Sequence, residues 1–135
     1  MPNYLFILIP LFLLAACGGG ARAGAPVIAL EAQTLELGDL PNGEIVERAV
    51  AVRNDGDAPL VVDTVTTSCG CTTAALEPMT LAPGESGVLR IAFDSGAHGP
   101  DLRGPLMREV MLASNDPATP EAVVTLRANI LPPVD

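Results

Sequence analysis

The chain has 135 residues, which suits a single domain, and its formal net charge is −9 with seven arginines and no lysine. Nucleic acids and anionic lipid surfaces are bound mainly through Lys and Arg, so this charge balance argues against both as direct partners. The sequence has no P-loop, no dinucleotide-binding glycine pattern and no paired carboxylates at a defined spacing. We therefore expect the protein not to be an enzyme.

The first sixteen residues, MPNYLFILIPLFLLAA, contain an apolar run from Tyr4 to Leu14 that ends in small residues. This run is too short to span a bilayer as a helix, and its plan is that of a secretory signal. It lacks the usual positive start, because the first Lys or Arg is Arg22. We predict that residues 1–16 are a signal peptide.

The segment from Leu14 to Cys17, LAAC, resembles a bacterial lipobox. The resemblance implies that Cys17 is diacylated on sulfur, by chains such as palmitate, and becomes the mature N-terminus. Residues 17–26 would then be the acylated cysteine and a flexible tether, and acyl chains would hold the protein to the membrane. The alternative is an ordinary cleaved signal followed by a free cysteine. We expect a lipoprotein of the bacterial cell envelope, anchored by lipid and extracytoplasmic.

Beyond Pro26 the chain consists of short apolar runs separated by Gly, Pro, Asn and Asp, without a long helical period. This pattern is typical of an all-β protein, and seven or eight strands over residues 27–135 favour an immunoglobulin-like β-sandwich. The expected strands are 27–31, 35–37, 45–53, 60–67, 72–76, 87–94, 106–113 and 122–130. The expected core includes Val50, Val52, Val62, Leu89, Ile91, Phe93, Val110, Val124 and Leu126.

The succession LELGDLPNGE, VRNDGDAPLVV, VTTSCGCTTA, LAPGESGVLRIAFDS and SNDPATP resembles a bacterial cell-envelope family known only as a domain of unknown function. The signature of that family is Ser-Cys-Gly-Cys-Thr, which residues 68–72 match, and its style is that of Hydin and major-sperm-protein immunoglobulin-like domains. The resemblance covers about Ile28 to Leu131. It implies the fold and the compartment, but it implies no reaction and no role for the cysteines.

Cys69 and Cys71 are separated only by Gly70. In an extended strand their Cα atoms would be about 6.6 Å apart, at the upper limit for a disulfide, so a bond between them requires a bend. We predict that the pair lies at a strand end or bend, that Gly70 adopts a conformation open mainly to glycine, and that the hydroxyls of Ser68 and Thr72 bind backbone groups of the turn.

Three roles for the pair remain open at this point. It could be a local disulfide or thiol pair that shapes a turn, a Cu(I) site with two thiolate ligands, or a partner in thiol-disulfide exchange. As a structural crosslink it would contribute little, because a three-residue loop stabilises by only about 1.6 kcal/mol in the chain-entropy model. The sequence does not decide between these roles.

Other side chains are weaker candidates. His98, the only histidine, is expected to be a solvated loop residue rather than a third metal ligand. Met107 and Met111 share one strand face with Glu109 and could form a copper ledge, but packing is the expected role, as it is for Met79. Asp94 or Asp101 could orient His98 as a base only through an accident of loop shape.

These observations favour a non-catalytic interaction module, anchored in the membrane, that holds another protein of the cell envelope. The alternative is a Cu(I)-binding or thiol-disulfide exchange protein that uses Cys69 and Cys71. No cofactor is expected apart from Cu(I) under this alternative.

Overall fold

The structure is a computed structural model that describes residues 24–135. The predictions about the signal peptide and about Cys17 lie outside the described residues. The described part is all β and contains no helix, so none of its elements is a helix long and apolar enough to cross a membrane. The prediction of an all-β domain is confirmed.

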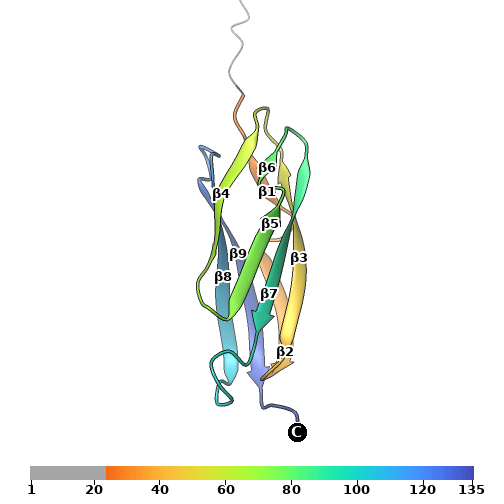
Figure 1. Ribbon diagram of the computed structural model, residues 1–135, viewed down its shortest axis with the longest axis vertical. Coiled ribbons are helices and arrows are strands. Elements are labelled where there is room, and N and C mark those ends of the chain that lie inside the picture. The colour runs from red at the N-terminus through yellow and green to blue at the C-terminus, as the bar shows by residue number, and fades with distance from the viewer. Residues whose placement is uncertain (1–23) are drawn as a thin grey trace, which may run out of the picture.

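Nine strands form two sheets that face each other. One sheet has four strands in the order β1-β3-β7-β5, and the other has five in the order β2-β9-β8-β4-β6. The strands are β1 (Ile28–Leu30), β2 (Thr34–Pro41), β3 (Ile45–Asn54), β4 (Leu60–Thr67), β5 (Thr72–Glu77), β6 (Thr80–Leu81), β7 (Ser86–Asp94), β8 (Gly104–Ser114) and β9 (Glu121–Leu131). Figure 1 shows the resulting elongated sandwich, with the strands running along its long axis.

The pairing is antiparallel except between β2 and β9, which run parallel. This parallel pair extends β2 beyond the predicted end at Leu37, because the register shifts around Gly38 and pairing then continues to Pro41. Gly38 has a φ of 74°, which glycine adopts without strain, and it therefore allows the irregularity inside the strand. The very short strand β6 was not predicted.

The core lies between the sheets and is made of residues that alternate along the strands with exposed ones. Along β7, for example, Leu89, Ile91 and Phe93 are buried, while Val88 and Arg90 are exposed. This alternation follows from the two-residue period of a strand. All nine residues predicted for the core are at most 3% exposed.

The two ends of the sandwich are closed by buried polar side chains. At the end where residue 24 enters, which we call the entry end, Asn54 accepts hydrogen bonds from the N–H groups of Val27 and Gly56 and donates to the carbonyls of Ala58 and Leu81. Each polar atom of this fully buried amide is therefore satisfied, as burial requires.

At the opposite end, which we call the distal end, the fully buried Ser95 hydroxyl accepts hydrogen bonds from the N–H groups of Gly43 and Glu44. It thereby joins the β2–β3 turn to the end of β7. The loop between β7 and β8 and the turn between β4 and β5 lie toward this end, as does the C-terminus (Figure 1). The candidate site described next belongs to the distal end.

Candidate functional site

The turn that carries Cys69 and Cys71 leads the chain from one sheet to the other. Strand β4 ends at Thr67 in the five-stranded sheet, and β5 begins at Thr72 in the four-stranded sheet. Cys69 and Cys71 form a disulfide, and their Cα atoms are 5.3 Å apart, closer than in an extended strand. The predicted bend at a strand end is confirmed.

The predicted details of this turn are wrong in two respects. Gly70 does not have a positive φ, and a Cβ atom added to it would have no neighbour within 4 Å, so neither backbone nor space demands glycine. Neither predicted hydroxyl binds a backbone group of the turn: that of Ser68 accepts a hydrogen bond from the N–H of Glu109 on the adjacent strand β8, and that of Thr72 lies 3.6 Å from the Sγ of Cys71. The turn is held by Thr67, whose hydroxyl lies within hydrogen-bonding distance of the carbonyls of Cys69 (3.0 Å) and Thr72 (3.1 Å).

The two cysteines have different environments. Cys71 is 4% exposed and belongs to the core, and its carbonyl accepts a hydrogen bond of 2.8 Å from the N–H of Asp94. Cys69 is only half-buried, and its sulfur accepts a hydrogen bond of 3.0 Å from the N–H of Cys71. One sulfur therefore belongs to the protein interior and the other lies at its surface.

Arg108 brings a cation to the buried sulfur. It lies on β8 between Leu106 and Val110, in the register that faces the interior, and its Nε lies 3.4 Å from the Sγ of Cys71. Its Nη1 donates to the carbonyl of Met107 at 2.8 Å. Arg108 is not among the residues predicted for the site, although it is a charged residue in the apolar phase of a predicted strand, which is the signal that could have indicated it.

His98 comes to the exposed sulfur from the loop between β7 and β8. The side chain is exposed, as expected for a solvated loop residue, but its Nε2 lies 3.7 Å from the Sγ of Cys69. The imidazole nitrogen and the two sulfurs all lie within 4.8 Å of one another. The fold therefore gathers three side chains that could share one metal ion, provided that the disulfide is first reduced.

The methionines and the aspartates of the sequence analysis do not join this group. Met107 is 55% exposed on β8, in the register opposite to that of Arg108, and Met111 shares its outward register. Met79 precedes β6 and pairs through its carbonyl with Val62, toward the entry end. The carboxylate of Asp94 accepts a hydrogen bond from Gly96 within its own loop, and Asp101 is exposed.

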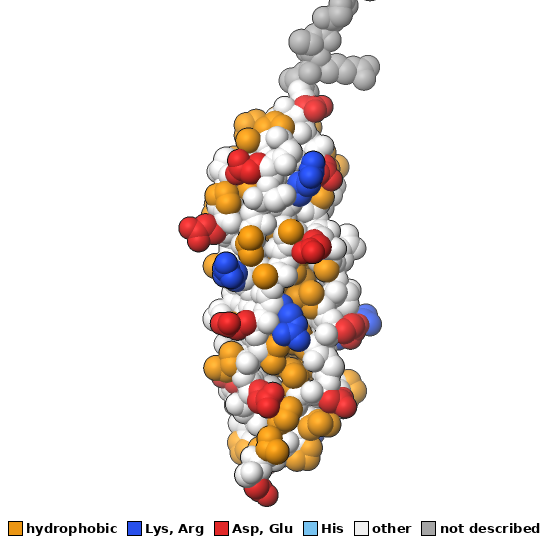
Figure 2. All heavy atoms as spheres, turned by 90° about the vertical axis from the view of Figure 1, so that its right-hand side faces the viewer, with side chains coloured by type: hydrophobic (Ala, Val, Ile, Leu, Met, Phe, Trp, Pro, Cys, Tyr) orange, Lys and Arg blue, Asp and Glu red, His pale blue; other side chains and the backbone are white. Residues whose placement is uncertain are grey.

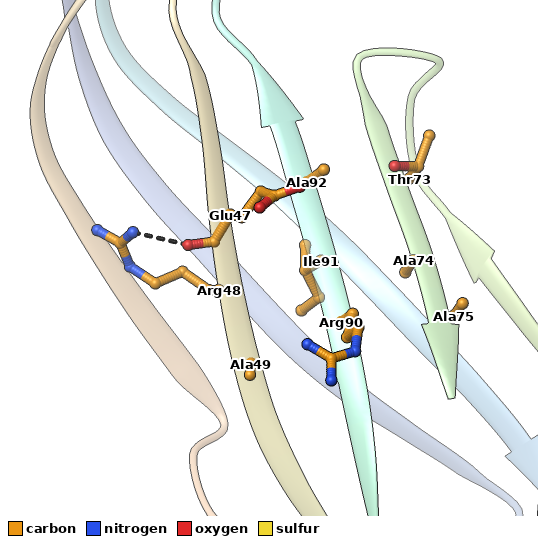
Figure 3. A pocket seen from close by; sticks show the side chains of 9 residues that line it. All are labelled: Glu47, Arg48, Ala49, Thr73, Ala74, Ala75, Arg90, Ile91 and Ala92. Carbon is orange, nitrogen blue, oxygen red and sulfur yellow. Dashed lines mark hydrogen bonds between the residues drawn. The ribbon is translucent and has the colours of Figure 1, made fainter. Parts of the chain in front are cut away.

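A second feature lies on the outer face of the four-stranded sheet. A depression of about 480 Å³ is lined there by side chains of β3, β5 and β7. The depression is bordered by the short side chains of Ala49, Ala75 and Ala92 and by two longer ones, Glu47 on β3 and Arg90 on the central strand β7 (Figure 3). No sequence pattern had indicated this depression.

The edge of β3 next to this depression is open. β1 pairs with β3 only at residues 52–54, and among residues 24–135 no strand pairs with the same edge from Ile45 to Val50. Figure 2, which views the side of the domain that lies to the right in Figure 1, shows apolar side chains between scattered acidic and fewer basic ones. This side of the domain is neither strongly charged nor uniformly polar.

Comparison with known proteins identifies the family. Residues 28–130 match the family described as protein of unknown function (DUF1573). The chain belongs to this family. The expected membership of a domain-of-unknown-function family is thus confirmed, and the match covers nearly all of the DUF1573 domain that the structure describes. No curated protein matches the sequence.

Solved structures support the fold of the DUF1573 domain. A protein of unknown function from Porphyromonas gingivalis W83 is 28% identical with a TM-score of 0.68, over 83% of this chain and 51% of that one. This chain thus spans about half the length of that relative. The ASH/PapD-like domain 7 of human CEP192 is 9% identical with a TM-score of 0.61, over 100% and 99% of the two chains.

The Vibrio cholerae VesB protease is 19% identical with a TM-score of 0.57, over 76% of this chain and 31% of the protease chain. At these low identities, the likenesses to CEP192 and VesB show the fold alone. Together with the two-sheet architecture, these likenesses confirm the predicted immunoglobulin-like β-sandwich.

Proposed function

We propose that the protein is a membrane-anchored, extracytoplasmic module that binds another protein of the cell envelope and does not catalyse a reaction. The observation that carries this proposal is the open edge of β3 from Ile45 to Ala49. An unpaired edge offers a row of N–H and C=O groups to an incoming strand, which is a common way for sandwich domains to bind extended segments.

The hydrogen bonds of Ala51 define which backbone groups face this edge. Both its N–H and its C=O point toward Glu31, because the N–H donates to the Glu31 carboxylate and the C=O accepts from the Glu31 N–H. The two-residue period of a strand then directs the corresponding groups of Ala49, Glu47 and Ile45 to the same side. Consistent with this, the carbonyl of Glu47 accepts a hydrogen bond from Arg48 Nη1 and from no other strand (Figure 3).

The side chains next to this edge suit an extended partner. Ile45 is 68% exposed, and Ala49 lines the shallow depression on the outer face of the sheet. A strand laid beside β3 would extend this sheet and place alternate side chains next to Glu47 and Ala49, at the border of the depression. The depression is lined by charges of both signs, from Glu47, Arg48 and Arg90. This favours a partner segment of mixed polar character.

Replacing Ala49 with proline tests this proposal. Proline removes the N–H that faces the open edge but leaves the hydrogen bonds between β3 and β7 in place, since the Ala49 N–H points away from β7. A photo-reactive residue at position 47 should crosslink an envelope protein to the domain. We expect Ala49→Pro to abolish this crosslinking. Ala49→Val retains the N–H and serves as the matched control.

Two further controls separate a specific edge from general adhesion. A crosslinker at Arg127, which is exposed on the inner strand β9 of the other sheet, should capture no such protein. The melting temperature of Ala49→Pro must also remain close to that of Ala49→Val. Equal capture by both variants would show that the β3 edge does not hold the partner.

A second candidate function is supported by the proximity of Cys69, Cys71 and His98. After reduction, two thiolates and one imidazole would offer three donors within 4.8 Å, and soft thiolate donors favour Cu(I). We expect the reduced protein to bind one Cu(I) ion in competition with a chromogenic chelator, and His98→Ala to bind it more weakly. Unchanged affinity in His98→Ala would remove the imidazole from the site, and absence of binding would remove Cu(I) as a ligand.

A further inference from the structure

The disulfide at the distal end is asymmetric in exposure, in charge and in hydrogen bonding. We propose that Cys69–Cys71 is a redox-active disulfide with a fixed polarity, in which a thiol of a partner protein attacks Cys69 and Cys71 leaves as a thiolate beside Arg108. This inference goes beyond the proposed function and does not depend on it, since the β3 edge and the cysteine turn are different parts of the molecule. Each disulfide oxidises one partner dithiol stoichiometrically, so the module remains non-catalytic.

Exposure decides which sulfur is attacked. Cys71 is 4% exposed, whereas Cys69 is half-buried at the surface. The residue between them is glycine, and the space where its side chain would be is empty to at least 4 Å. The surface of the turn beside Gly70 is therefore open to an approaching thiolate. Access is one of the determinants of the rate of thiol-disulfide exchange.

The contacts of Cys71 suit a leaving group. A nearby cation stabilises a thiolate, and a more stable thiolate leaves faster. Arg108 Nε lies 3.4 Å from Cys71 Sγ, and the Thr72 hydroxyl lies 3.6 Å from the same sulfur. Both groups can donate hydrogen bonds to the negative charge that forms when the sulfur–sulfur bond breaks. Arg108 is itself only partly buried, in the inward register of β8, so its guanidinium reaches the buried sulfur from the border of the core.

The short loop favours reversibility. Only one residue separates the cysteines, so the disulfide restricts the unfolded chain very little and receives little stabilisation from that source. The turn has other contacts that hold it, namely the hydroxyl of Thr67 and the pairing of Thr72 with Phe93. The oxidised and reduced forms can therefore share one backbone.

The reaction requires a dithiol protein as reductant. A partner thiolate forms a bond to Cys69 Sγ, the Cys69–Cys71 bond breaks, and its electron pair stays on Cys71. A second thiolate of the partner then attacks the partner's own sulfur in the mixed disulfide, and Cys69 leaves as a thiolate to which His98 Nε2, at 3.7 Å, can donate a hydrogen bond. The partner is oxidised by two electrons, and the pair is reduced by two.

Glutathione serves as the test probe for the polarity. The oxidised protein is treated with reduced glutathione, quenched with acid and mapped by mass spectrometry. We expect the glutathione adduct on Cys69, with Cys71 free. An adduct mainly on Cys71, or adducts distributed equally over both, would overturn the polarity.

The role of Arg108 is tested by the rate of that first attack. Replacing the cation by a neutral side chain in Arg108→Met should slow reduction by glutathione roughly tenfold, while Arg108→Lys retains most of the rate. Arg127→Met, the same exchange on the outer face of β9, is the matched control and should react as the parent does. Equal rates in Arg108→Met and Arg127→Met would overturn the assignment, and melting temperatures establish that each variant is folded.

Discussion

Asp116 shows how a single turn residue joins distant parts of this sandwich. Its side chain is 1% exposed, and one carboxylate oxygen accepts hydrogen bonds from the N–H groups of Ala118 and Thr119. The other oxygen accepts from Ile28, which lies 88 residues away at the start of β1. The local bonds follow from the Asn-Asp-Pro turn, whereas the bond to Ile28 depends on the tertiary structure.

The pKa of Asp116 reflects these contacts. Burial raises the pKa of this carboxyl, but the three backbone N–H donors outweigh burial, and the pKa lies below its ordinary value of 3.8. A lowered folded-state pKa stabilises the protein above pH 3.8, and this contribution is lost as the pH falls through the folded-state value.

We therefore expect Asp116→Asn to be less stable than the parent by about 1 to 3 kcal/mol at neutral pH, because its amide group cannot accept all three bonds. The difference should become smaller as the pH falls below 3.8, since the parent then loses its charge. Urea unfolding at a series of pH values measures both effects. A difference that is constant with pH would contradict the assignment of this charge to Asp116.

At the scale of the elements, we predict how much the disulfide in the turn between β4 and β5 contributes to the free energy of unfolding. Replacing both Cys69 and Cys71 by alanine removes a small covalent loop and part of a buried side chain. We expect a loss of about 2 kcal/mol in the free energy of unfolding, because the loop entropy of so short a crosslink is small. Chemical denaturation checks this value, and a loss several times larger would mean that the turn depends on its disulfide.

Elements with a strong alternating pattern could be predicted from the sequence, and elements defined by tertiary pairing could not. β7 and β9 were found with nearly correct ends, since apolar residues alternate along them. β6 is only two residues long, and it exists because Leu60 and Val61 pair with it. The extension of β2 past Gly38 depends on the parallel partner β9, which no local pattern indicates.

The candidate site was predictable to the same degree. The cysteine pair and its bend follow from spacing and from the geometry of strands, but the neighbours of the pair do not. His98 and Arg108 lie 29 and 37 residues from the cysteines they contact, on a loop and on a strand of the opposite sheet. Only the packing of the two sheets and the course of the β7–β8 loop bring them together.

At the scale of the whole molecule, the lipid anchor stays a prediction, and a substitution of Cys17 can test it. If acyl chains on this cysteine hold the protein to the membrane, Cys17→Ser should appear in the soluble fraction, because the remaining chain carries a net negative charge and no acyl chain. Membrane fractionation of cells that produce each form provides the measurement. Equal sedimentation of the serine variant with membranes would contradict lipidation.

The position of the cysteine turn has a consequence for the anchored protein. Residue 24 enters at one end of the elongated domain, while the cysteine turn lies toward the other (Figure 1). A protein held by its N-terminus would therefore carry the sulfur of Cys69 toward the end of the domain that faces away from its own bilayer. Its partners would be found in the aqueous space or on a facing surface, and shortening residues 18–23 should leave the reaction with a soluble partner unaffected.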